Sequence, residues 1–280
     1  MFKEYPYTYR AYGLSIASQI PVTGFEPAPV DNPDVVIRIG EVPENLAKVI
    51  NETRFYQSNA EEFLLKTTKV GNLYISNGDQ IVVQTGVNPS DSNLSAYIVG
   101  MAFGAIMHQR RLLPLHASTV VYHDKCLVFA GRSGAGKTTI AAALLAAGAS
   151  LLADDVSVVD FTHETPAIRP AFPTLKIWAD SLQHMGIETK GLIPVQNEEQ
   201  KYYLPVENFN NRFTAIHQVF ILHPQNQAAI EIKPLTGVDK FQALKKYTYL
   251  FRGIPHTGLE QNHFVLVNQL AQQVPVHLLI

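Results

Sequence analysis

The stretch Gly131-Arg132-Ser133-Gly134-Ala135-Gly136-Lys137-Thr138 decides the fold of this chain. It matches the pattern G-x-x-x-x-G-K-[ST] in full, in which the glycines let the backbone curl so that successive N–H groups face phosphate oxygens. An apolar run at residues 127–130 precedes it, and a helix-forming run at 139–145 follows it. We therefore predict a strand, a phosphate-binding loop and a helix in this order, and a chance match in a glycine-rich turn is the weaker interpretation.

The side chains of this loop predict how it would hold a nucleotide. Lys137 supplies a positive charge to the β- and γ-phosphates, and the Thr138 hydroxyl is suited to hold Mg²⁺. ATP and Mg²⁺ are therefore the expected ligands, with GTP and pyrophosphate left open as donors because no base pocket is visible in the sequence. The expected nucleotide-binding residues are Gly131, Arg132, Ser133, Gly134, Ala135, Gly136, Lys137, Thr138 and Thr139.

Two acids follow the next predicted strand. Leu151-Leu152-Ala153-Asp154-Asp155 is an apolar run that ends in paired carboxylates. Two carboxylates so close cannot both ionise freely unless a cation compensates. This favours one acid facing Mg²⁺ and the other acting as a base toward a hydroxyl group. A solvent-exposed turn is the alternative interpretation of the same pair.

One histidine and several basic side chains complete the candidate site. His116 lies in the apolar run at 113–119, where a structural core histidine is the alternative interpretation. An arginine beside the transferred phosphoryl group would stabilise its negative charge, or could bind a peptide carboxylate. Arg252 has apolar neighbours and is the preferred candidate. The weaker candidates are Arg169, Arg212, Lys176 and Lys201.

The pattern of expected elements divides the chain in two. Strands are expected at 7–14, 35–39 and 72–76, and the turn Asn77-Gly78-Asp79 predicts a hairpin into 80–84. A cluster of turn and N-cap residues at 88–92 precedes a helix expected over about residues 93–111. We therefore predict a small β-rich domain over 1–88 and an α/β domain with a mixed sheet over 89–280. Further strands are expected at 115–122, 125–130, 150–153 and 274–280.

Composition restricts the class of protein. The 280 residues are 46% hydrophobic and 16% charged, as in globular proteins. Lys+Arg 22 against Asp+Glu 24 gives a net charge of −2, without the basic excess of proteins that bind nucleic acids or anionic membranes. The single Cys126 permits no internal disulfide, and no signal peptide is visible. We expect a cytoplasmic protein without nucleic-acid or membrane partners, and a homo-oligomer stays open.

The chemistry-bearing segments together resemble a known family. His116-Ala117-Ser118, a strand pair, the loop at 131–138 and Leu152-Ala153-Asp154-Asp155 are similar, in this order, to the catalytic half of the HPr serine kinase/phosphorylase family. The resemblance implies an HPr kinase/PEP-carboxykinase-like P-loop domain. It also implies that His116 orients the catalytic acid, that Asp155 is the base and that Asp154 lies near the metal. The division of roles between the two aspartates stays open.

The chain departs from that family downstream. The family's signature of the type E-I-R-G-x-G is replaced here by the segment 173–182, and the first 88 residues also differ. With the segments 175–182, 201–205 and 274–278, the chain looks closer to the lasso-peptide kinases, which phosphorylate the C-terminal serine of a precursor peptide. This resemblance implies an ATP- and Mg²⁺-dependent serine kinase with a peptide partner. The alternatives are a true HPr kinase/phosphorylase in carbon regulation and, in another class, a nucleotide-dependent switch or binding module without phosphoryl transfer.

Overall fold

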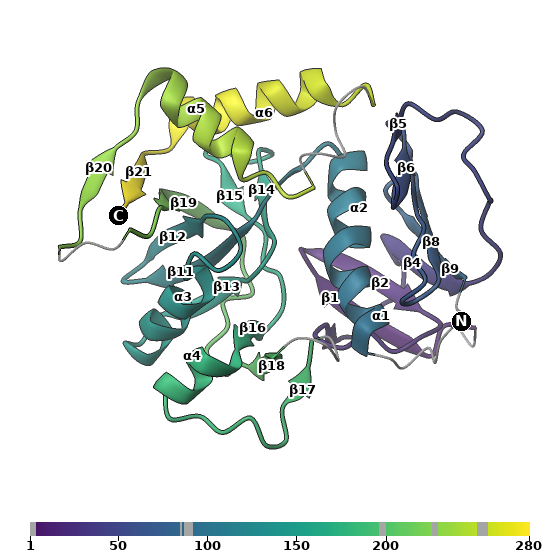
Figure 1. The fold of residues 1–280 in the computed structure, drawn as a ribbon, viewed down its shortest axis with the longest axis horizontal. Helices are drawn as coiled ribbons and strands as arrows, with labels where there is room; N and C mark the ends of the chain where they lie inside the picture. The colour runs from purple at the N-terminus through teal and green to yellow at the C-terminus, as the bar shows by residue number, and fades with distance from the viewer. Residues whose placement is uncertain (1–3, 85, 87–91, 196–199, 226–228, 251–256) are drawn as a thin grey trace.

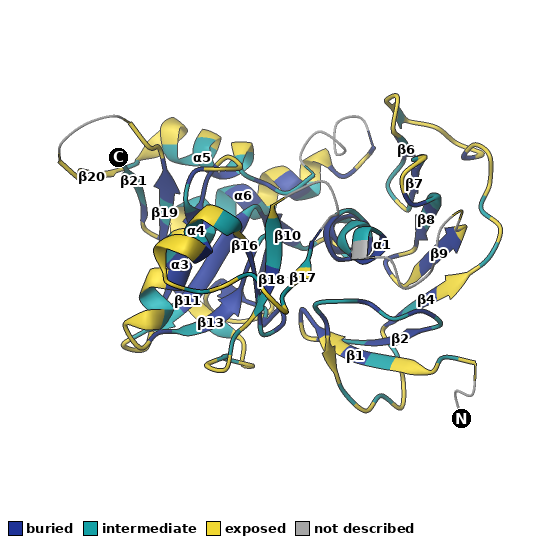
Figure 2. Cartoon of the chain, turned by 60° about the horizontal axis from the view of Figure 1, so that its bottom comes forward, coloured by how far each residue is buried: buried dark blue, intermediate teal, exposed yellow. Residues whose placement is uncertain are grey.

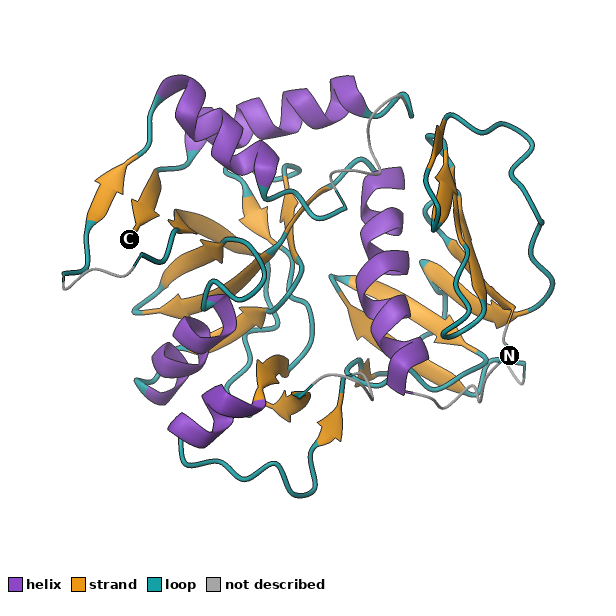
Figure 3. Ribbon diagram, viewed as in Figure 1, coloured by secondary structure: helices purple, strands orange, loops and turns teal. Residues whose placement is uncertain are grey.

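The computed structural model describes residues 4–84, 86, 92–195, 200–225, 229–250 and 257–280. Two large sheets dominate the molecule, and the helical segment at residues 92–109 stands between them (Figure 1). Strands outnumber helices, and the helices lie on the outside of the second sheet or between the sheets (Figure 3). The predicted mixed α/β architecture is therefore confirmed.

The N-terminal sheet has nine strands in the order β3-β1-β2-β4-β9-β8-β7-β6-β5. β2 and β9 each pair in parallel with β4, and the other neighbours are antiparallel. The predicted hairpin turn joins β8 to β9, with Asn77 and Gly78 at φ of 55° and 71°. The bounds are β1 Tyr7–Ala11, β2 Leu14–Ser18, β3 Glu26–Pro27, β4 Val35–Ile39, β5 Asn51–Glu52, β6 Tyr56–Ser58, β7 Glu62–Leu65, β8 Asn72–Ser76 and β9 Gln80–Gln84.

The single strand predicted over residues 7–14 is wrong, because Tyr12 and Gly13 form a tight turn between β1 and β2. Both residues have positive φ, 55° and 68°, as in a two-residue hairpin turn. The turn contacts the second half of the molecule: Arg169 Nη1 donates to the Tyr12 carbonyl at 3.3 Å. A Cβ on Gly13 would lie 2.7 Å from the Phe213 ring, so only glycine fits this contact between the two halves.

The second large sheet follows the order β10-β14-β15-β19-β12-β11-β13, with β21 beside β19 and β20 beside β21. The strand predicted over 115–122 is interrupted at His116, which lies between β10 and β11. A small third sheet has the order β16-β18-β17. The bounds are β10 Leu113–Leu115, β11 Ala117–Tyr122, β12 Lys125–Ala130, β13 Ser150–Ala153, β14 Ser157–Asp160, β15 Ala167–Ile168, β16 Thr174–Trp178, β17 Ile193–Pro194, β18 Lys201–Pro205, β19 Thr214–Leu222, β20 Ile232–Pro234 and β21 Val276–Leu279.

The helix predicted over 93–111 is present as α1 Ser92–Tyr97, a π-helical turn η1 Ile98–Ala102 and α2 Phe103–Gln109. The other helices are α3 Lys137–Ala146, α4 Ala179–His184, α5 Gly237–Lys246 and α6 Glu260–Gln273. In the described part of the chain, no helix is both long and apolar enough to cross a membrane. The boundary predicted between residues 88 and 89 lies outside the described residues.

One hydrophobic core joins the two halves. It contains residues of the N-terminal sheet, of the helical segment 92–109 and of one face of the second sheet, which α5 and α6 cover. A smaller core lies under α3 on the opposite face. Alternate side chains of β12 point to opposite faces of the sheet and so contribute to both cores. Cys126 and Val128 face the first core, and Phe129 faces the second. Figure 2 shows the buried strands of the second sheet between partly exposed helices.

Candidate active site

The carboxyl ends of β12 and β13 meet at one edge of the second sheet. β11 lies between these strands and is antiparallel to both, so β12 and β13 run in the same direction. Gly131 follows β12, and Asp154 follows β13. The glycine-rich loop and the paired acids are therefore brought together, at the kind of sheet edge where α/β folds bind ligands.

The loop at 131–136 turns sharply from β12 into α3. Gly134 and Gly136 have φ of 77° and 91°, left-handed values that would strain any other residue. Gly136 precedes the first residue of α3 and makes no side-chain capping bond to the first N–H groups of the helix, which have no intrahelical acceptor. Such N–H groups attract anions, and the predicted strand–loop–helix arrangement is thus suited to phosphate.

Lys137 is turned back onto the loop. Its Nζ donates to the carbonyls of Gly131 and Arg132 and to His116 Nε2, each at 3.0 Å. Burial lowers the pKa of Lys137 to about 8, although Asp155 and Asp154 act in the opposite direction. The ammonium group therefore occupies the mouth of the loop and is poised between its charged and neutral forms.

His116 connects Lys137 to Asp155. Because an ammonium group can only donate, Nε2 accepts from Lys137, and the proton is assigned to Nδ1. Nδ1 lies 3.0 Å from the Asp155 carbonyl and 3.5 Å from its Oδ1. Burial lowers the pKa of His116, with Asp155 opposing, so the ring is neutral at pH 7. These contacts fix the ring beside both residues.

Asp154 is buried and fully engaged. Its Oδ1 accepts hydrogen bonds from the hydroxyls of Ser118 and Thr138, the latter at 2.9 Å. Its Oδ2 accepts from the backbone N–H of Lys176 at 2.7 Å. The carboxylate is therefore held rigidly against the Thr138 hydroxyl at the start of α3.

Asp155, unlike Asp154, borders the pocket, and 17% of its side chain is exposed. It has φ of 69°, and the Val156 N–H donates to the Asp154 carbonyl at 2.8 Å, which closes a strained three-residue γ-turn. Its Oδ2 accepts from Lys176 Nζ at 2.9 Å. Burial alone would raise the pKa of Asp155, but Lys176, Lys201 and His116 outweigh burial and hold it below its usual range.

A pocket of about 310 Å³ joins these groups. The loop and Thr138 form one side of it, and Asp155 and His116 form another. It is also bordered by side chains from β16, α4 and β18: Trp178, Asp180, Ser181 and Lys201. The ammonium of Lys201 lies 5.6 Å from the centroid of the Trp178 ring. The pocket thus combines an anion-binding loop with an ionised carboxylate.

The oxygen atoms at Thr138 and Asp154 fit a magnesium ion bound together with a nucleotide. Mg²⁺ prefers hard oxygen ligands and is usually held by one or two protein groups, water and substrate phosphates. A Thr hydroxyl 2.9 Å from a buried carboxylate oxygen supplies that donor set. Among the described residues, no cluster of three or more His, Cys, Asp or Glu side chains could hold a metal ion.

The remaining predicted residues are distributed unevenly. Ser133 and Thr139 border the pocket, whereas the Ala135 side chain is buried in the core under α3. Arg169 does not border the pocket, and its guanidinium group forms an ion pair with Asp160 at 2.7 Å. Arg252 lies outside the described residues, so its predicted role stays a prediction.

Lys176 and Ser118 are the main site residues that sequence reasoning underrates. Lys176 is 4% exposed and bonds both aspartates, one through its backbone and one through its side chain. Its pKa is raised because Asp155 outweighs the effect of burial. A lysine within the apolar strand Leu175-Lys176-Ile177 is the signal that could have identified it.

We expect ATP binding to be accompanied by proton uptake near pH 8. Phosphate oxygens near Lys137 favour its charged form and raise its pKa from about 8. At a pH equal to that pKa, up to about half a proton per site is taken up. Calorimetric titration with ATP at pH 8, in buffers of different ionisation enthalpy, measures this uptake.

The matched control is Lys137→Arg, whose guanidinium group is always protonated. This variant should bind ATP without the proton uptake. Equal proton uptake by the native protein and the arginine variant would contradict the assignment to Lys137.

The comparisons with known proteins find a likeness to solved structures only. No protein-family model and no curated protein matches the chain. Among solved structures, the Hpr(Ser) kinase/phosphatase from Coxiella burnetii is similar over 59% of this chain and 77% of that chain, with 14% sequence identity and a TM-score of 0.31. This likeness is too distant to carry any conclusion about chemistry, which rests on the geometry above.

Proposed function

We propose that this chain is a kinase that transfers the γ-phosphoryl group of ATP to a serine hydroxyl. The observation that supports this most is the shared pocket, in which the anion-binding loop and the ionised Asp155 face the same space. A phosphate-binding loop alone fits any nucleotide-binding protein. A carboxylate held in its charged form at the phosphate site is what transfer to a hydroxyl requires.

In this proposal each residue has a definite task. The loop N–H groups and Lys137 bind the β- and γ-phosphates, for which Lys137 exchanges its bonds to the loop carbonyls for phosphate oxygens. Thr138 and Asp154 would hold Mg²⁺, which neutralises phosphate charge when bound. Neutral His116 keeps Asp155 in place through its Nδ1 hydrogen bond.

Asp155 accepts a hydrogen bond from the acceptor hydroxyl and then its proton. The hydroxyl oxygen forms a bond to the γ-phosphorus while the bond from that phosphorus to the β–γ bridging oxygen breaks, leaving ADP and a phosphoserine. Its lowered pKa makes Asp155 a weak base, but one that stays ionised. Orientation is the main requirement, because the transferred group passes through a loose transition state and the hydroxyl proton leaves late.

For the acceptor we propose a peptide, namely the C-terminal serine of a ribosomally made precursor of the lasso type. The resemblance of the segments 175–182, 201–205 and 274–278 supports this choice. The first two of these segments form β16, α4 and β18, which border the pocket through Trp178, Asp180 and Lys201. This wall of the phosphate pocket is therefore built from the sequence that carries the resemblance.

Incubation of the protein with γ-labelled ATP, Mg²⁺ and peptides ending in serine tests the proposal. We expect label on these peptides and none on matched peptides ending in alanine. ATP binding without label on any serine peptide would contradict the kinase proposal and favour a nucleotide-dependent switch.

A further inference from the structure

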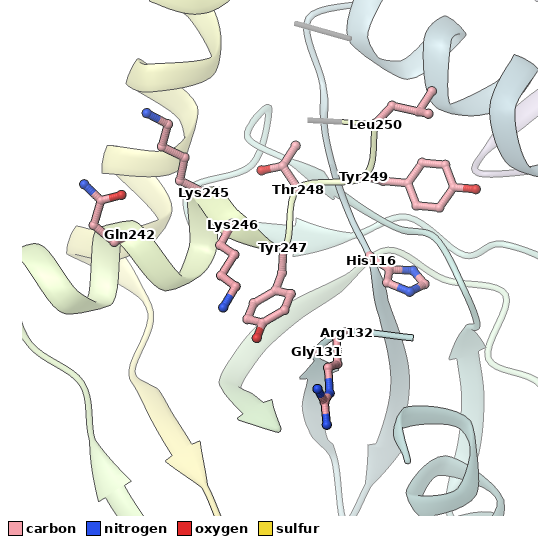
Figure 4. Close-up of a pocket in the computed structure, with 10 residues that line it drawn as sticks. All are labelled: His116, Gly131, Arg132, Gln242, Lys245, Lys246, Tyr247, Thr248, Tyr249 and Leu250. Carbon is pink, nitrogen blue, oxygen red and sulfur yellow. The ribbon is translucent and has the colours of Figure 1, made fainter. Parts of the chain in front are cut away.

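A second, larger cleft adjoins the phosphate pocket. It has a volume of about 830 Å³, and residues from the end of α5 and from the start of the glycine-rich loop line it (Figure 4). The two hollows share His116, so the cleft leads to the catalytic side chains. We call it the basic cleft, and its lining is His116, Gly131, Arg132, Gln242, Lys245, Lys246, Tyr247, Thr248, Tyr249 and Leu250.

The far wall of the basic cleft is fixed to the catalytic strands by backbone hydrogen bonds. The His116 N–H donates to the Tyr247 carbonyl, and the Tyr249 N–H donates to the Pro114 carbonyl, both at 2.8 Å. On the other side, a Cβ on Gly104 of α2 would lie 2.9 Å from the Tyr249 ring. The end of α5 is therefore held at a set position relative to His116, and the cleft is preformed.

The chemistry of the cleft is cationic and aromatic. Arg132, Lys245 and Lys246 line it, and no Asp or Glu is among its described lining residues. The Lys246 ammonium lies 5.4 Å from the centroid of the Tyr247 ring. In Figure 4 the Lys246 and Arg132 side chains extend on either side of Tyr247. Such a surface attracts carboxylates and offers ring faces to the chain that carries them.

The position of the cleft points to the acceptor rather than the nucleotide. The phosphate pocket is lined by residues 133, 134 and 136–139, on the side of the α3 N-terminus, whereas the cleft is lined by the first two loop residues. The hollows meet at His116, whose Nε2 is 3.0 Å from Lys137 Nζ. Lys137 is the residue expected to contact the β- and γ-phosphates of the nucleotide. A peptide chain bound in the cleft would therefore lie near the γ-phosphate.

We propose that the basic cleft binds an acceptor peptide through acidic side chains that flank its serine. This inference rests on the proposed function and adds the chemical class of the acceptor. A segment with glutamate or aspartate next to the serine places carboxylates against Arg132, Lys245 and Lys246 while the hydroxyl reaches Asp155.

Fluorescence anisotropy of labelled serine peptides, with ADP and Mg²⁺ present, tests this without turnover. A peptide with glutamates before the serine should bind about tenfold more tightly than the same peptide with glutamines. Lys246→Glu should remove this preference, and Lys125→Glu, an exposed site at the other end of β12, should leave it intact. Both peptides are prepared as C-terminal amides and as free acids.

Three results would overturn the inference: equal affinity for the two peptides, a preference that persists in Lys246→Glu, or a preference that depends on the free C-terminal carboxylate alone. A loss of ATP affinity in Lys246→Glu would also overturn it, because the cleft would then serve the nucleotide. A glutamate preference without phosphorylation of either peptide would instead contradict the proposed kinase activity and leave the cleft assignment standing.

Discussion

The Asp155→Asn protein should transfer the phosphoryl group about 100- to 10,000-fold more slowly, with ATP affinity within a few fold of the native value. Asparagine keeps the shape of the side chain and tolerates the positive φ of 69° at this position. It carries no charge to orient the acceptor hydroxyl and take its proton. Single-turnover kinetics measure the transfer rate, and an equilibrium titration measures the ATP affinity. The affinity should be retained because Thr138 and Asp154 are unchanged.

Asp160→Asn is the matched control for this change. Asp160 is buried and also pairs with a cation, Arg169, but it lies at the end of β14, outside the pocket. Both variants lose an ion pair of a carboxylate that is mostly shielded from solvent, so both are expected to lose stability. Only Asp155→Asn should lose rate per folded molecule. Unchanged turnover in that variant would contradict the assignment of Asp155 as the base.

The parts of the site that sequence predicts well are those fixed by local geometry. The turn from β12 into α3 requires left-handed φ at residues 134 and 136, and both positions are glycine. The local sequence therefore predicts this turn. The strand β13 ends at Ala153 as predicted, since an apolar run followed by two aspartates marks its end. The sequence-based predictions agree with the structure where the conformation is determined by residues that are close together in the chain.

Other parts of the site depend on register between strands, which local patterns do not specify. Ser118 meets Asp154 because β11 pairs with β13 near Thr119 and Ala153. Lys176 reaches both aspartates only because β16 passes beside the end of β13. The lysine within an apolar strand singles out Lys176 as unusual, but no local pattern in Ser118 or Lys176 predicts which residues they contact. They follow from tertiary pairing between segments far apart in the chain.

The misjudged N-terminal strand has a similar cause. The run from Tyr7 to Leu14 has strand composition throughout, and Tyr12 is a residue that disfavours positive φ. The turn exists because the hairpin tip is packed against the second half, where the Tyr12 ring contacts Phe103 and Phe172. Packing therefore overrides the local preference at the point where the two halves meet.

Replacing Lys176 by methionine should destabilise the protein by about 3–5 kcal/mol at neutral pH, because it leaves the Asp155 carboxylate without its nearest cation. In the native protein the lowered pKa of Asp155 gives stability that is present above the usual carboxyl pKa and is lost as pH falls through the depressed value. In the variant this pKa rises from the native value, so protonation relieves the penalty at a higher pH. Urea unfolding of both proteins across acid pH should show a deficit that shrinks as the pH falls.

Two further variants distinguish this electrostatic cause from a loss of packing. Lys176→Met combined with Asp155→Asn should be more stable than Lys176→Met alone, since no charge is then left without a partner. Lys201→Met should lose little stability, because Lys201 is only half-buried and no salt bridge is formed by its ammonium group among the described residues. If the double variant were no more stable than the single one, and the deficit did not change with pH, Lys176 would act through packing alone. The ionised state of Asp155 would then need another source, such as the ammonium groups of Lys137 and Lys201 in the same pocket.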